Sequence, residues 1–173
     1  MKKTLITGFV AAMALFLLSN VTLAQKDKSK RPSAPAQITE TVGSTKITID
    51  YSQPSKNGRA IFGELVPYGQ VWRTGANEAT WIELSADVKV QGQTLKAGKY
   101  ALFTIPGAEE WTIIFNSKWD QWGNYNYSDK DDVLRVKAKP TKTTLTEKFT
   151  ITLDKSGKVS MAWDETKVEF TVK

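Results

Sequence analysis

The arginine residues of this chain are few, and three of them lie in or beside segments without a regular sequence pattern. The chain has 24 lysine and arginine residues, and its arginines are Arg31, Arg59, Arg73 and Arg135. The planar guanidinium group makes bidentate hydrogen bonds that a lysine ammonium cannot reproduce. Arg59 and Arg73 fall within residues 54–80, and Arg135 follows residues 117–132. This placement indicates that geometry matters at these positions.

Aromatic residues are concentrated in the same two segments, which we call loop one (54–80) and loop two (117–132). Aromatic rings beside guanidinium or amide donors hold sugars and other flat polar ligands in many proteins. The sequence therefore predicts a ligand site drawn from both loops. Its candidate residues are Arg59, Trp72, Arg73, Asn77, Glu78, Trp122, Asp132 and Arg135.

A purely structural role for these residues is the alternative. The rings would then cover the open ends of the fold, and the three arginines would pair with Glu78, Asp131 or Asp132. Ion-pair networks of this kind bury charge without any function. For Arg73 we expect a carboxylate or backbone carbonyl partner, with the guanidinium facing a pocket shared with Asn77 and Trp122.

Much catalytic chemistry is excluded by composition, because the chain has no histidine and no cysteine. It cannot form a Ser-His-Asp triad, a cysteine nucleophile, or an imidazole or thiolate metal site. Two-carboxylate glycosidase chemistry, oxygen-ligated calcium and lysine chemistry remain. No carboxylate pair stands in a recognisable motif, and the acidic residues of 129–132 lack the spacing of an EF-hand. We expect no metal and no cofactor, and a non-catalytic protein is favoured over an enzyme.

The first residues have the features of a secretory signal. Lys2 and Lys3 precede an apolar stretch from Leu5 to Leu18, and small residues lead up to Ala24. This pattern predicts cleavage after Ala24 and a periplasmic or secreted protein. The apolar stretch is shorter than the roughly 20 residues of a membrane-spanning helix. The formal charge of +6 is concentrated before Pro32, in this segment and the basic one that follows it, so a nucleic-acid partner is not expected.

From Gln37 onward, apolar and polar residues alternate with a period of two, which predicts strands. A flexible basic leader is expected at 25–36 and a single β domain at 37–173. The fold class is all-β, an antiparallel two-sheet sandwich, with a jelly roll as one form of it and a short helical turn within 59–70. Residues 111–115 are apolar on both faces, which indicates a central strand. Turns are expected at 154–157 and 164–165.

Several short motifs resemble the DUF2911 family of exported bacterial proteins. They are YSQP at 51–54, GR at 58–59, VWRTGANE at 71–78, AGKY at 97–100, IPG at 105–107 with Trp111, QWG at 121–123, and DVLR at 132–135. The resemblance covers nearly all of the predicted mature domain. It implies an exported β domain of the bacterial envelope and assigns no function or site residue.

Three functions are compatible with these observations. The first is binding of a saccharide or small polar ligand in the bacterial envelope. The second is an envelope scaffold that contacts another protein, which would need a flat apolar patch. The third is a carboxylate-based glycoside hydrolase, which would need two carboxyl groups about 5–10 Å apart in a cleft.

Overall fold

The computed structural model describes residues 28–173. The predicted signal segment and its cleavage site at Ala24 lie outside these residues. Within the described part, no helix is long and apolar enough to cross a membrane. The only helices assigned there are two short 3-10 turns, η1 (Lys28–Lys30) and η2 (Asp129–Asp131), so the predicted all-β class is confirmed.

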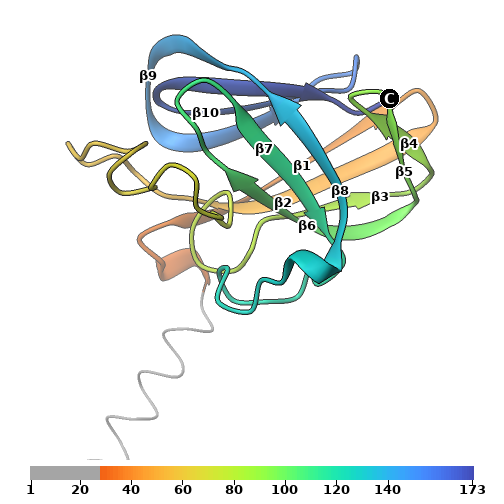
Figure 1. Cartoon of the computed structure of the whole chain (residues 1–173), viewed down its shortest axis with the longest axis horizontal. Helices are drawn as coiled ribbons and strands as arrows, with labels where there is room; N and C mark the ends of the chain where they lie inside the picture. The colour runs from red at the N-terminus through yellow and green to blue at the C-terminus, as the bar shows by residue number, and fades with distance from the viewer. Residues whose placement is uncertain (1–27) are drawn as a thin grey trace, which may run out of the picture.

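The main element is a six-stranded antiparallel sheet in the order β1-β2-β3-β6-β7-β8 (Figure 1). Each strand pairs with the next along the chain, except that the small hairpin β4–β5 is inserted between β3 and β6. The connections are therefore those of a meander rather than the Greek-key crossings of a jelly roll. The strands of this sheet are β1 (Ala34–Val42), β2 (Thr45–Gln53), β3 (Trp81–Leu84), β6 (Gly98–Ile105), β7 (Trp111–Asn116) and β8 (Asp132–Ala138).

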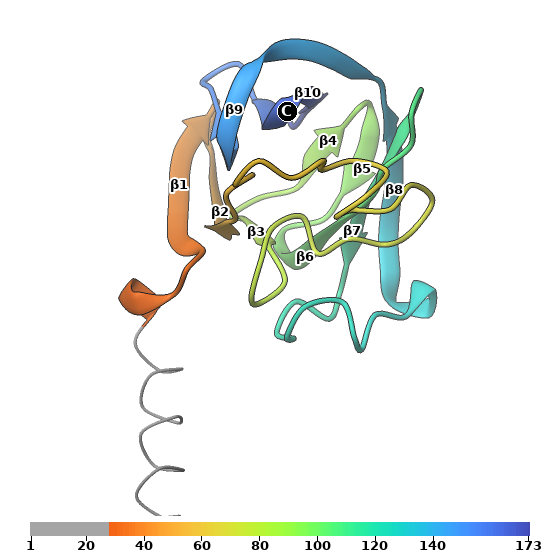
Figure 2. The same ribbon diagram turned by 90° about the vertical axis from the view of Figure 1, so that its left-hand side faces the viewer.

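A long hairpin covers the large sheet. Its strands, β9 (Pro140–Leu153) and β10 (Lys158–Thr171), pair only with each other within their own sheet. Viewed end on, the six-stranded sheet curves like a trough and the β9–β10 hairpin lies across its open side (Figure 2). The hairpin β4 (Val88–Val90) and β5 (Gln93–Leu95) joins this layer through hydrogen bonds between Lys89 and Lys173. The result is a sandwich that is not closed into a barrel.

The predicted alternation is confirmed in the strands that enclose the core. Ile47, Ile49 and Tyr51 of β2 are buried, and Phe149 and Ile151 of β9 face them from the other layer. Tyr51 extends across the core, where its hydroxyl accepts from Ile151 N at 3.0 Å. Burial of apolar area at about 25 cal/mol per Å² is the main stabilising contribution to such a core.

Strand β7 is buried along its whole length, as its two apolar faces predicted. Ile113 and Phe115 point into the main core. Ile114 points to the other side, into a small second cluster with Phe103 and Ala79. Loops one and two cover this outer face of the large sheet. Ala79 of loop one belongs to the second cluster, and Tyr127 of loop two packs its ring against Phe103 with centroids 5.1 Å apart.

Two local expectations took a different form. The turn expected at 164–165 is instead a bulge inside β10, where Asp164 has φ +55° and the register with β9 shifts. A residue in the left-handed region changes the strand direction locally without ending the pairing. The helical turn expected within 59–70 is a compact turn, in which Val66 N donates to Ile61 O at 2.9 Å.

Candidate functional site

Loop one borders a pocket with a volume of about 390 Å³. Loop one runs from the end of β2 at Gln53 to the start of β3 at Trp81, as predicted. The pocket lies between the outer part of this loop, the segment before β1 and Trp163 of β10. Of the predicted site residues, the pocket brings together Arg59, Trp72 and Arg73. The other lining residues are Pro32, Ser33, Pro54, Ser55, Asn57, Leu65, Val66, Gly75, Ala76 and Trp163.

Two stacked indoles lie on the core side of this pocket. The rings of Trp72 and Trp163 have centroids 5.8 Å apart and an interplanar angle of 17°. Phe62 and Phe149 pack against them edge to face. Trp72 is only 8% exposed, and its Nε1 donates to Gly75 O at 3.1 Å. It is therefore mainly a core residue that also lines the pocket.

Arg73 is half-buried and lines the pocket beside Trp72. Its Nε is buried and donates no hydrogen bond, and within residues 28–173 the guanidinium has no ion-pair partner. Burial without a counter-charge lowers the pKa of Arg73, although the nearby Tyr125 acts in the opposite direction. The expected carboxylate or carbonyl partner is absent from the described residues. A buried unsatisfied donor costs free energy, about 1–3 kcal/mol and more for a charged group.

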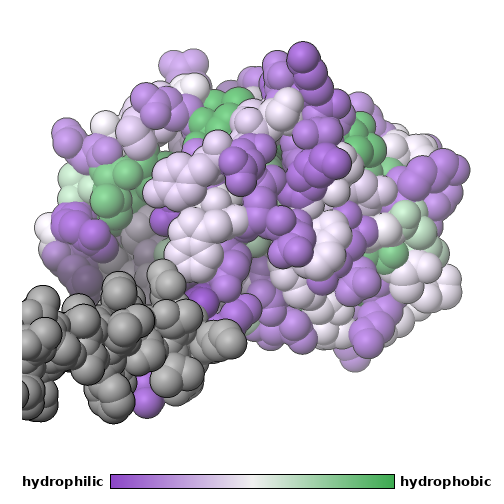
Figure 3. Space-filling model, turned by 90° about the horizontal axis from the view of Figure 1, so that it is seen from below, coloured by the Kyte–Doolittle hydropathy of each residue, from purple (hydrophilic) through white to green (hydrophobic). Residues whose placement is uncertain are grey.

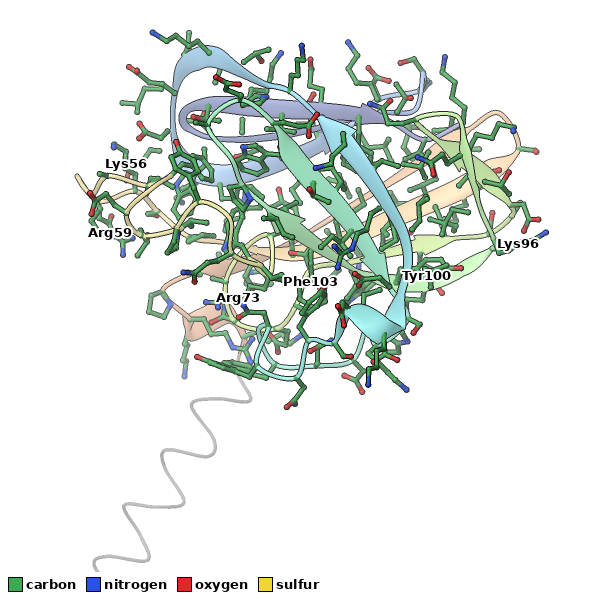
Figure 4. The ribbon with its side chains drawn as sticks, in the orientation of Figure 1. Lys56, Arg59, Arg73, Lys96, Tyr100 and Phe103 are labelled. Carbon is green, nitrogen blue, oxygen red and sulfur yellow. The ribbon has the colours of Figure 1, made fainter. Side chains whose placement is uncertain are left out.

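Arg59 also lines this pocket. It lies on an exposed turn at the outer end of loop one (Figure 4). Its Nε donates to Lys56 O at 2.9 Å, and its Nη2 donates to Ser55 O. Lys56 returns a hydrogen bond to Arg59 O at 2.7 Å and forms an ion pair with Asp164. Backbone carbonyls thus hold this guanidinium in place without neutralising it.

Asn77, Glu78 and Trp122 lie outside this pocket, where they hold the segment before β1. Arg31 forms an ion pair with Glu78 at 2.6 Å and lies 5.6 Å from the ring centre of Trp122. Asn77 donates to Ser33 O at 3.2 Å. This segment falls within the predicted leader, and Pro32 and Ser33 form one wall of the pocket.

Asp132 and Arg135 form a separate network at the start of β8. Arg135 pairs with Asp132 at 2.6 Å, and the same carboxylate accepts from Tyr127 Oη and Asn116 Nδ2, each at 2.8 Å. Desolvation and the hydrogen bond to Asp132 raise the pKa of Tyr127 to about 12. The structural role considered for the arginines therefore applies to Arg135.

Sequence patterns missed several lining residues. Trp163 falls within the alternating pattern that predicts strands, and the role of Ser33 depends on the course of a segment expected to be flexible. Asn57 has φ +49° and donates its backbone N–H to Glu147 of β9 at 2.8 Å. The Asn57-Gly58 pair signals a turn in the sequence, but its contact with β9 is set by tertiary structure.

The chemistry available in the pocket is defined by charge. The described residues that line it include two arginines, one asparagine and two serines, but neither aspartate nor glutamate. In the part of the chain that the structure describes, no three metal-ligating side chains gather in one place. The arrangement offers a polar ligand guanidinium, amide and hydroxyl donors beside two largely buried indoles.

A comparison with protein families matched residues 33–172 to the model described as "Protein of unknown function (DUF2911)". This match covers all ten strands of the domain. Searches among curated proteins and solved structures returned no match.

Proposed function

We propose that this chain, which belongs to the DUF2911 family of proteins of unknown function, binds a small polar ligand in the pocket between Arg59 and Arg73. A saccharide is the ligand type that fits these donors best. The proposal is carried by Arg73, whose guanidinium lies half-buried at the pocket without a partner in residues 28–173. A ligand in the pocket would supply the acceptor that residues 28–173 do not; because Nε itself is buried, the ligand would pair with the terminal Nη groups.

The size and lining of the pocket support this proposal. Pockets for small molecules occupy about 300–1,000 Å³ and combine apolar walls with a few fixed polar groups. This pocket, at about 390 Å³, falls at the lower end of that range. Trp72 and Trp163 supply the apolar wall, while Arg59 is already held by backbone carbonyls. We expect a ligand the size of one or two sugar rings.

The sequence also supports a site of action outside the cytoplasm. The basic and apolar pattern before Ala24 is that of a cleavable signal, and we propose a periplasmic or secreted protein. A small polar ligand would reach such a protein directly in the envelope or medium.

The two other functions have less support. A protein-docking scaffold would use a continuous apolar patch, whereas the face in Figure 3 carries hydrophobic residues only in small groups among hydrophilic ones. A glycoside hydrolase would place two carboxyl groups at the pocket, and none of the residues within 28–173 that line it carries one.

A thermal-shift screen of glycans and metabolites tests the proposal, because a ligand that binds only the native state raises its melting temperature. The substitution Arg73→Lys keeps the charge but removes the planar fork, so we expect at least a tenfold loss of affinity for any hit. Arg135→Lys is the matched control and should keep full affinity. Equal binding by wild type and Arg73→Lys would contradict the proposed site.

A further inference from the structure

From the charge balance around the pocket, we infer that its ligand carries an anionic group, a carboxylate or phosphate, that pairs with Arg73. This inference rests on the proposed function and names the chemical class of the ligand. It distinguishes an acidic sugar or sugar phosphate from a neutral saccharide, both of which would satisfy the proposal above.

The first step is that the described residues lining the pocket carry two fixed positive charges and no negative one. Among residues 28–173, Arg59 and Arg73 are the only charged residues that line the pocket. Arginine stays protonated in proteins, so the site cannot lose this charge by titration. The backbone carbonyls that hold Arg59 orient its guanidinium but carry no formal charge.

The second step is that carboxylates on neighbouring segments have other partners. Glu78 pairs with Arg31 at 2.6 Å and with Lys28 at 3.5 Å. Asp164, next to the lining residue Trp163, pairs with Lys56 at 3.0 Å. Glu147 accepts from the backbone of Asn57 at 2.8 Å. None of these carboxylates is placed to neutralise Arg73.

The third step concerns Arg73 itself. Its Nε is buried away from water without an acceptor, and burial lowers its pKa. Loop two lies close to the terminal nitrogen Nη1 of Arg73. A Cβ atom placed on Gly123 would be 3.7 Å from that nitrogen. Hydrogen bonds from a guanidinium to an anion are about twice as strong as those between neutral groups. An anionic ligand therefore gains more from this site than a neutral one.

The test compares sugars that carry an acidic group with their neutral counterparts. Protein expressed from the full-length gene, in the form that the cell accumulates, is titrated with D-glucose, D-glucuronate and D-glucose 6-phosphate at constant ionic strength. D-galactose and D-galacturonate repeat the comparison with a second sugar. Inorganic phosphate and sulfate test whether a free anion suffices. Affinity is measured by calorimetry, and the Arg73 Nε–H resonance is followed by NMR in the wild type, so a folding defect in a variant does not decide the outcome.

We expect an acidic sugar of at least one pair to bind tenfold or more tightly than its neutral counterpart and to shift the Arg73 Nε–H resonance. Arg73→Lys should remove this preference, whereas Arg135→Lys should retain it. Binding by phosphate or sulfate at equal affinity would support the anion site and identify a free anion as the ligand. Equal binding of neutral and acidic sugars would overturn the inference but leave the proposed function intact. If no anion binds, the inference is wrong, and the neutral sugars alone then decide the proposed function.

Discussion

Arg73 and Arg135 look alike in the sequence, since both are rare arginines beside loops, but their surroundings differ. Arg135 is paired with Asp132, whose side chain is only 7% exposed. Arg73 has no such partner among the described residues. The difference arises because Tyr127, Asn116 and Asp132 converge only in the folded chain. The arginine residues in the sequence indicated positions where fixed geometry matters. Whether such an arginine has an ion-pair partner, as Arg135 does, or has none among the described residues, as with Arg73, depends on tertiary contacts.

Replacing Asp132 should destabilise the domain more than replacing Arg135. Asp132→Ala leaves the donors of Asn116, Tyr127 and Arg135 without their acceptor, so we expect a loss of about 2–4 kcal/mol in the free energy of unfolding. Arg135→Lys keeps a charge at a half-exposed position and should cost less than about 1 kcal/mol. Urea unfolding of both variants provides the measurement. Equal losses would show that the carboxylate is not the centre of this network.

At the scale of elements, loops one and two are structural as well as candidate binding segments. Ala79 N donates to Gln121 O at 3.0 Å and Gly123 N donates to Asn77 O at 3.1 Å, so the loops are joined to each other. Together they cover the outer side of β6 and β7. The length of the two loops correctly indicated that they do more than connect strands. That they cover β6 and β7 could not be predicted, because the order of strands in the sheet was not known from the sequence.

The strands were predictable where one face is buried, because alternation then follows the pleat. Residues 45–53 are an example, since their burial alternates along most of β2. Residues 140–148, the first half of β9, lack this signal, because they are largely exposed on both faces. The bulge at Asp164 was mistaken for a turn, since local sequence cannot show that pairing continues beyond it.

The segment before β1 should loosen from the domain in acid. Burial alone would raise the pKa of Glu78, but the hydrogen bond from Arg31 and the charge of Lys28 lower it below its ordinary value of 4.5. A carboxylate with a lowered pKa stabilises the folded form above its unfolded pKa, and this contribution is lost as the pH falls through the folded pKa. We therefore expect the Arg31 contact with Glu78 and Trp122 to weaken below pH 4.5.

The indole N–H resonance of Trp122 provides the measurement. In the wild type it should shift with a midpoint below pH 4.5, when Arg31 is released. In Glu78→Gln the resonance should already have its acid position at neutral pH. An identical titration in both proteins would show that Glu78 does not hold this segment.

For the whole molecule, the aromatic cluster joins parts of the chain that are far apart in sequence. Trp72 comes from loop one, Trp111 from β7 and Trp163 from β10, and the ring centroids of Trp72 lie 6.4 Å from those of Trp111 and 5.8 Å from those of Trp163. The indoles of Trp72 and Trp163, which line the pocket, therefore also lie at the junction between the large sheet and the β9–β10 hairpin. The stability of the proposed binding site and that of the sandwich therefore depend on the same contacts.

This shared junction predicts a single cooperative unfolding transition. Emission from the buried tryptophans should report separation of the two layers, and far-UV circular dichroism should report loss of strands. Because Trp72, Trp111 and Trp163 are all within one buried cluster, we expect both signals to have the same urea midpoint. Reducing agent should not change that midpoint, since the chain has no cysteine. A fluorescence transition at lower urea than the circular dichroism transition would mean that the β9–β10 hairpin detaches first, and the pocket would then open before the six-stranded sheet unfolds.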